Sequence, residues 1–262
     1  MLAELTAAGQ RPDLIVGVSA GAINGAFFAA EPSRERVEAM AALWRSITTR
    51  LALGLSWRSV LGVVGLRDHV ASPQALRSLL STRLGYRDFA AAAVPLHVVC
   101  AELVTGREIV LSSGPVVEAV LASAAIPGVF PPVSVGGQSL VDGAVAANTP
   151  IATAIRLGAT RLIVLPAGFA CAAKRLARGP LARAMHAVTL LGARQLLQDF
   201  ERYGALTPIH VVPPLCPVEH SSYDYAHAAE LIDRARSSTR AWLAAGGLTR
   251  REFPGPLQVH SH

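Results

Sequence analysis

The feature that most constrains this chain is the run from Asp13 to Ala26, which reads DLIVGVSAGAINGA. The apolar residues Leu14–Val18 predict a strand, and the small residues from Ala20 onward predict a helix. Between them, GVSAG fits the G-x-S-x-G pattern of a nucleophile elbow, a tight strand-to-helix turn that exposes a serine Oγ. The sequence therefore predicts Ser19 as a nucleophile, and an ordinary strand–turn–helix with a serine N-cap is the alternative.

The two glycines of this motif, Gly17 and Gly21, are expected because side chains there would clash where the turn closes. A helix that begins at Ala20 would direct unpaired backbone N–H groups and the positive end of its dipole toward the serine. Both features stabilise negative charge, so the Ala20 amide is the predicted donor to an oxyanion intermediate.

Beyond this run, apolar β-type segments alternate with helical patterns, which predicts an α/β layer fold without internal repeats. The other strands are expected at 96–102, 108–112, 139–141, 161–165 and 209–212. The other helices are expected at 1–8, 33–50, 72–84, 116–123, 151–157, 172–203 and 224–245. The apolar segment 51–66 is interpreted as a lid over an acyl pocket, with buried core as the alternative.

Composition excludes several classes of protein. Hydrophobic residues make up 52% of the 262-residue chain, yet no apolar run reaches the roughly 18 residues that a membrane span needs. No signal peptide is visible, and three cysteines without C-x-x-C spacing fit reduced thiols, which predicts a cytoplasmic protein. The sequence has no metal-ligand cluster and no nucleic-acid-binding motif, so neither partner is expected.

A serine nucleophile needs a base. None of the eight histidines stands in a distinctive motif, although His210 and His220 follow late predicted strands, where the histidine of an α/β-hydrolase triad would lie. Asp142 is the stronger candidate because the strand predicted at 139–141 leads directly into the only Asp-Gly pair of the chain. An ordinary Asp-Gly turn is the alternative explanation for that pair.

Four blocks within residues 14–150, taken together and in order, resemble the bacterial patatin-like phospholipases. They are the serine block 17–25, the hairpin 100–106, the proline block 122–133 and the aspartate block 141–150. The resemblance implies a three-layer α/β/α patatin-like fold with a mainly parallel central sheet. It also implies a single acyl hydrolase domain over residues 1–262, in which 171–262 form a less distinctive helical part.

The resemblance further implies a catalytic dyad of Ser19 and Asp142 that needs no cofactor. The implied reaction is ester hydrolysis through an acyl-serine intermediate, with phospholipids or other acyl lipids as substrates. Aspartate is a weak base in water, and burial in an apolar site would raise its pKa into a useful range. The flanking residues implied for the site are Gly17, Ala20 and Gly21 at the serine and Gly143 and Ala144 at the aspartate.

One part of the family pattern has no counterpart here. The Gly-Gly-Gly-x-Arg-Gly loop that precedes the serine block and supplies oxyanion N–H groups is missing, and 1–9 resemble the helix that follows it. Either the natural chain extends upstream of Met1, which the intact Ser19 and Asp142 favour, or the chain is a catalytically weak lipid-binding homologue. An α/β-hydrolase esterase with a Ser-His-Asp triad is a further alternative.

Lipid hydrolysis requires access to a membrane or micelle. Basic residues interspersed with leucines over 174–194 indicate an amphipathic surface for anionic lipid headgroups, and hence peripheral membrane contact. A surface helix that packs on the core is the alternative. The basic residues are Lys174, Arg175, Arg178, Arg183 and Arg194.

Overall fold

The computed structural model describes residues 1–47, 71–167, 180–218 and 225–250. The chain divides into two compact units: the sheet unit, Arg11–Asn148, and the helical unit, Met1–Gln10 together with Thr149–His262. The lid expected at 51–66 lies outside the described residues, as do three of the basic residues expected to contact lipid, Lys174, Arg175 and Arg178.

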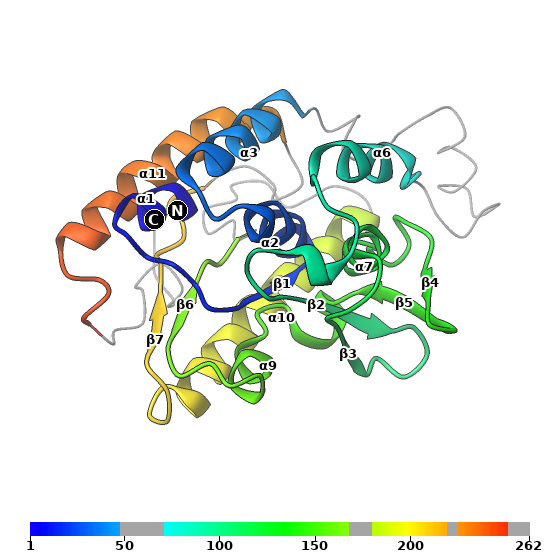
Figure 1. The fold of residues 1–262 in the computed structure, drawn as a ribbon. Coiled ribbons are helices and arrows are strands. Elements are labelled where there is room, and N and C mark those ends of the chain that lie inside the picture. The colour runs from blue at the N-terminus through cyan, green and yellow to red at the C-terminus, as the bar shows by residue number, and fades with distance from the viewer. Residues whose placement is uncertain (48–70, 168–179, 219–224, 251–262) are drawn as a thin grey trace. The chain divides into compact units, whose positions relative to one another are not determined.

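Among the described residues, the sheet unit contains a five-stranded mixed sheet, shown in Figure 1. Its strands are β1 (Ile15–Val18), β2 (Leu96–Glu102), β3 (Glu108–Leu111), β4 (Val133–Val135) and β5 (Gln138–Asp142). β1 runs parallel to β2, whereas β3 and β5 run antiparallel to β2, and β4 runs antiparallel to β5.

The register of β2 decides which strands share an edge. Val98 and Val99 pair with both β1 and β3, and Cys100 and Ala101 pair with both β3 and β5. Since a strand has two edges, β1 and β5 occupy the same edge of β2, and β3 occupies the other. The two strands that carry the candidate site residues therefore lie end to end along one neighbour.

Helices cover both faces of this sheet. On one face α2 packs so closely that a Cβ on Gly25 would stand 3.0 Å from the Ile15 side chain, and the Cys100 thiol donates to the Ala119 carbonyl of α7. On the other face, α8 packs through Ala147 against Val18 and Val99. The helices that the structure describes in this unit are α2 (Ala20–Ala30), α3 (Arg34–Ser46), α6 (Gln74–Arg83), the 3-10 turn η1 (Phe89–Ala91), α7 (Val116–Ser123) and α8 (Ala144–Ala147).

The predicted α/β fold is confirmed, and helices on both faces of a sheet are consistent with three α/β/α layers. The expectation of a mainly parallel sheet holds for β1–β2 and for a second pair, β6–β7. The other pairs among the described strands of the large sheet are antiparallel: β2–β3 and β4–β5 are hairpins with short turns, whereas β5 pairs with β2 after an intervening segment that contains α7.

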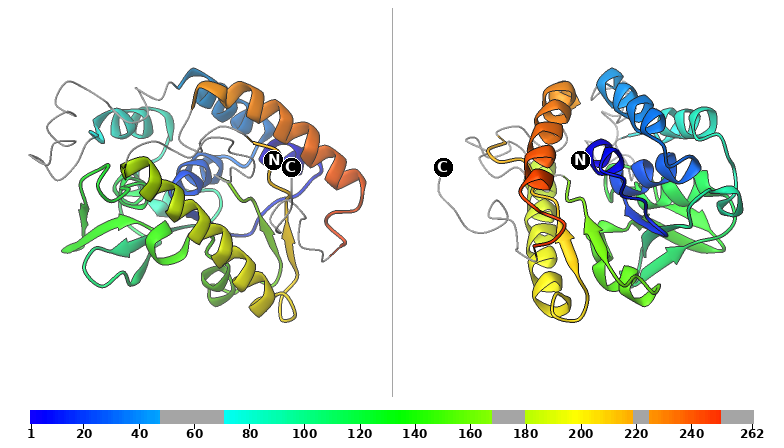
Figure 2. Two further views of the ribbon diagram at one scale, coloured as in Figure 1. Left: turned by 180° about the vertical axis from the view of Figure 1, so that it is seen from behind. Right: turned by 60° about the vertical axis from the view of Figure 1, so that its left-hand side comes forward.

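The helical unit combines a small parallel sheet with long helices. α1 contacts α11, as Figure 2 shows, and the Arg240 guanidinium pairs with the Glu4 carboxylate at 3.0 Å. Its elements are α1 (Leu2–Ala7), α9 (Ile151–Arg156), β6 (Leu162–Val164), α10 (Pro180–Tyr203), β7 (Ile209–Val211), the 3-10 turn η2 (Tyr225–His227) and α11 (Ala228–Ala244). None of the described helices combines the length and the hydrophobicity needed to cross a bilayer.

Candidate active site

The site forms where β1 and β5 meet. β1 runs with β2 and reaches as far as Val99, opposite Val18, while β5 runs against β2 and ends at Cys100, opposite Asp142. The two strands therefore run toward each other along the same edge of β2. Their convergence brings Ser19, the residue after Val18, next to Asp142.

Ser19 stands in a strained backbone conformation, with φ 52° and ψ −121°. It is the one residue other than glycine with a positive φ in the described part of the chain, and such strain in a non-glycine residue is found mainly at functional sites.

The predicted crowding at Gly17 is confirmed, because a Cβ there would lie 2.6 Å from the Gly21 carbonyl oxygen. The predicted clash at Gly21 itself is wrong, since a Cβ on Gly21 would meet open space.

The first turn of α2 presents free amide donors next to Ser19. The Ser19 carbonyl accepts from Ala22 and Ile23, which begins the helical hydrogen-bond pattern. Ala20 and Gly21 are exposed, and their N–H groups have no acceptor among the described residues. Two adjacent donors at a helix N-terminus can bind an anionic oxygen.

Asp142 is buried, with 3% of its surface exposed. Burial raises the pKa of Asp142 to about 6, although hydrogen bonds from the Ala144 amide and from the Ser19 hydroxyl lower it in part. The Ala144 N–H donates to Oδ1 at 2.8 Å, and the Asp142 N–H donates to the Ala125 carbonyl at 2.9 Å. The carboxyl group is thus fixed in direction and ionises near neutral pH.

Gly143 is required by close packing against β2. A Cβ on Gly143 would overlap the carbonyl oxygen of Val99, a backbone atom that cannot rotate away. Its φ is −62°, so the constraint is space and not backbone conformation. Cys100 is the residue of β2 that pairs with Asp142. Burial and the adjacent Asp142 raise the pKa of its thiol to about 12, so the thiol is neutral.

Ser123 is a residue at this site that the sequence did not single out. It is fully buried at the end of α7, where its Oγ accepts from the Ser19 N–H at 2.9 Å and donates to the Val99 carbonyl at 2.6 Å. The proline block 122–133 contained Ser123, but no local pattern distinguishes a serine that bonds across 104 residues from one that caps its own helix.

Within the described part of the sheet unit, the one histidine is His97, and it faces away from the site. It is paired with Val16 across β1 and β2, on the face opposite to Cys100 and Asp142, and its Nδ1 lies 2.7 Å from the Ser112 hydroxyl. His210 is on β7 in the helical unit, with Nδ1 3.2 Å from the Arg250 carbonyl. His220 lies outside the described residues.

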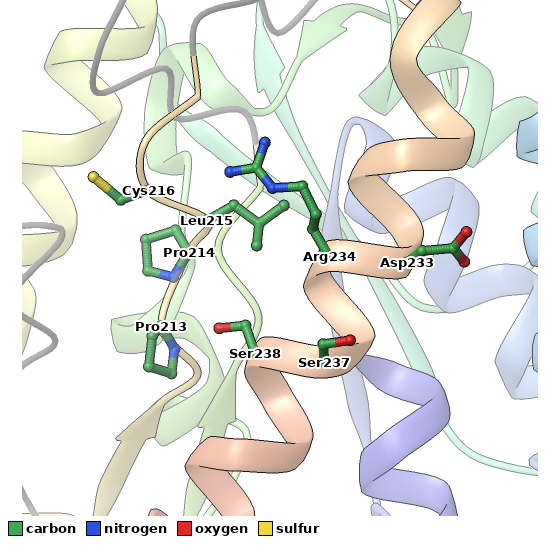
Figure 3. Close-up of a pocket in the computed structure, with 8 residues that line it drawn as sticks. All are labelled: Pro213, Pro214, Leu215, Cys216, Asp233, Arg234, Ser237 and Ser238. Atoms are coloured by element: carbon green, nitrogen blue, oxygen red, sulfur yellow. The ribbon is translucent and has the colours of Figure 1, made fainter.

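A separate pocket of about 510 Å³ opens in the helical unit, between the segment after β7 and α11 (Figure 3). Arg234, one of the charged residues that line it, donates hydrogen bonds to the Glu230 carboxylate and to the Pro217 carbonyl. None of the predicted site residues lines it. The lining residues are Pro213, Pro214, Leu215, Cys216, Asp233, Arg234, Ser237 and Ser238.

The described residues hold no cluster of three or more His, Cys, Asp or Glu side chains that could bind a metal ion.

A comparison with protein-family models identifies the family to which the sheet unit is similar. Residues 1–155 match the family model for patatin-like phospholipase. The match covers more than half of the 262-residue chain and includes β1 to β5 with both Ser19 and Asp142.

Proposed function

Since this chain belongs to the patatin-like phospholipase family, a family of lipid hydrolases, we propose that it hydrolyses carboxylic esters of phospholipids or other acyl lipids by a Ser19–Asp142 dyad. The observation that carries the proposal is the convergence of the ends of β1 and β5, which places Ser19 beside the buried Asp142, close enough for its hydroxyl to lower the pKa of that carboxyl group. In a Ser-His-Asp triad the carboxylate orients a histidine ring, so an aspartate placed directly beside the serine favours the dyad.

Acylation uses both residues. The Ser19 Oγ attacks the ester carbonyl carbon while its proton moves to the Asp142 carboxylate. The carbonyl oxygen becomes an oxyanion, which the exposed N–H groups of Ala20 and Gly21 stabilise. When the C–O bond of the ester breaks, Asp142 returns the proton to the leaving alkoxide, which departs as an alcohol or a lysolipid.

Deacylation repeats these roles with water. Asp142 removes a proton from a water molecule, whose oxygen attacks the acyl carbon of the acyl-serine. The second oxyanion binds the same two amides. Collapse of this intermediate releases the fatty acid, and the proton on Asp142 passes to the Ser19 Oγ. The resting dyad is thereby restored.

The raised pKa of Asp142 supports its role as base. A carboxylate with an ordinary pKa is too weak a base to remove a proton from a serine hydroxyl efficiently, and a pKa of about 6 brings it closer to the working pH. Burial also excludes water from the carboxylate, which strengthens its interaction with Ser19.

The proposal is tested by hydrolysis of p-nitrophenyl butyrate and of phosphatidylcholine in mixed micelles. Ser19→Ala is expected to lower kcat at least about 10³-fold, since only binding and the oxyanion amides remain. Ser134→Ala, which removes an exposed hydroxyl on β4, is the matched control and is expected to leave kcat unchanged. Lipid binding without turnover in the folded wild-type protein would favour the non-catalytic alternative.

The triad alternative is separated by two further variants. His210→Ala and His220→Ala are expected to retain kcat within about threefold, because no histidine takes part in the dyad mechanism. Loss of turnover in either folded variant would contradict the dyad and favour the α/β-hydrolase triad.

A further inference from the structure

The parallel ladder between β1 and β2 is interrupted at the nucleophile. The Ile15 N–H donates to the Pro95 carbonyl at 2.8 Å. In a parallel pair alternate residues donate to alternate carbonyls, so the series continues from Gly17 to His97 and would continue from the Ser19 N–H to the Val99 carbonyl. That last bond is not made.

The hydroxyl of Ser123 occupies the position of the missing bond. It accepts from the Ser19 N–H at 2.9 Å and donates to the Val99 carbonyl at 2.6 Å. Both groups that would have bonded each other are therefore satisfied through one oxygen atom. The inserted oxygen holds the two strands apart at the point where β1 ends.

We propose that Ser123 is a positioning residue of the active site, a hydroxyl wedge that ends strand pairing at Val18 and holds Ser19 in its strained conformation. This inference rests on the proposed function, because it assigns a purpose to the position of the nucleophile. Without the wedge, the Ser19 amide can bond the Val99 carbonyl directly, which extends β1 by one residue and relaxes the φ of 52°.

The same segment also fixes the base. Two residues beyond Ser123, the Ala125 carbonyl accepts from the Asp142 N–H at 2.9 Å. The end of α7 thus holds the backbone of the nucleophile through one bond and the backbone of the base through another. α7 is itself anchored to β2 by the Cys100 thiol, which donates to the Ala119 carbonyl.

The wedge requires a group that donates and accepts at once. A serine hydroxyl does both with one small oxygen, whereas alanine does neither and leaves two polar backbone groups to pair with each other or stay unsatisfied. Because the wedge contacts no substrate, its loss is expected to misplace the Ser19 Oγ relative to Asp142. The change should therefore appear in kcat and not in KM.

The experiment compares kcat, KM and Tm for Ser123→Ala, Ser123→Thr, Ser19→Ala and a control, Thr239→Val, with p-nitrophenyl butyrate. Thr239 is a buried hydroxyl in α11 that donates to the Ala235 carbonyl at 2.6 Å, so its variant also removes one buried hydrogen bond. Ser123→Ala is expected to lower kcat about 10²-fold with KM within about twofold. Ser123→Thr keeps the hydroxyl and is expected to recover at least about tenfold of that loss.

Thr239→Val is expected to lower Tm by about 2–4 °C and to leave kcat unchanged. A kcat of Ser123→Ala within about threefold of wild type, or an equal kcat loss in Thr239→Val, would overturn the wedge. If Ser123→Ala fails to fold, Ser123→Thr decides: near wild-type kcat supports the wedge, and a loss as large as about 10²-fold at wild-type Tm overturns it. Unchanged turnover in Ser19→Ala would instead refute the proposed function, whatever the Ser123 variants do.

Discussion

The ends of β1 and β5 supply one candidate catalytic residue each, and each end is destabilised by a different physical effect. At the end of β1 the unfavourable contribution to the free energy of folding comes from the backbone, because Ser19 has a φ of 52°, which residues with a side chain disfavour. At the end of β5 the backbone is relaxed and the unfavourable term is in the side chain, because Asp142 is an ionisable group removed from water. The strain and the desolvation can therefore be removed separately.

The two ends share one requirement, which is close approach of backbone to backbone. Gly17 is packed against the first turn of α2, and Gly143 is packed against the Val99 carbonyl of β2. Neither glycine has a positive φ, so both are needed for space. Gly21, on the open side of the elbow, meets nothing and provides the contrast.

The largest effect is expected where the β5 end is most crowded. Gly143→Ala should lower the free energy of unfolding by more than about 3 kcal/mol, because the added Cβ overlaps a backbone carbonyl that cannot move without breaking the sheet. Gly21→Ala is the matched control and should be neutral or stabilising by up to about 1 kcal/mol, since it adds a methyl in open space on a helix. Urea denaturation measures both, and similar losses in the two variants would remove the distinction.

Asp142→Asn removes the free-energy cost of burying an ionised carboxylate at the end of β5. The raised pKa means that the folded protein holds the Asp142 proton between about pH 4 and pH 6 while the unfolded chain has lost it. Stability contributed by this group therefore falls as pH rises through that window and stays low above it. Asp142→Asn should abolish turnover yet raise the free energy of unfolding at pH 8 by up to about 3 kcal/mol.

Chemical denaturation of wild type and Asp142→Asn at pH 4 and pH 8 checks this expectation. The advantage of the variant should be small at the acid end and reach its full value above pH 6. A variant that is less stable than wild type at pH 8 would mean that the Asp142 carboxylate is a net stabiliser, and the contrast with the β1 end would be lost.

The same group sets the pH dependence of the reaction. Since the base acts only when ionised, kcat/KM should fall about tenfold for each pH unit below the pKa of Asp142, about 6, and level off above it. The profile is measured with an uncharged ester at constant ionic strength. A profile that is flat from pH 5 to pH 8 would argue against Asp142 as the base.

The smallest effect concerns the backbone strain at the β1 end. Ser19→Gly and Ser19→Ala both remove the nucleophile, but only glycine adopts a φ of 52° without strain. Ser19→Gly should therefore be more stable than Ser19→Ala by about 1–2 kcal/mol, as measured by thermal or urea unfolding. Equal stability of the two variants would show that the elbow holds no strain at this position.

The sequence by itself determined the features that depend on near neighbours. The strand into Ser19, the helix from Ala20 and the crowding at Gly17 all lie within a few residues, so their pattern could be interpreted directly. The hairpin of β4 and β5 was missed, although Gly136-Gly137 at its turn, with φ of 58° and 79°, is a hairpin signal of the same local kind.

Only the tertiary structure decided how distant segments meet. The sheet register places the ends of β1 and β5 against each other on one edge of β2, and it makes the Val99 carbonyl the group against which Gly143 packs and to which Ser123 donates. A one-residue change in that register would turn Asp142 to the opposite face of the sheet. The pattern of residues along the chain identifies candidate catalytic residues. The distance between them and their protonation depend on packing between segments more than 100 residues apart, as the hydrogen bond between Ser19 and Ser123 illustrates.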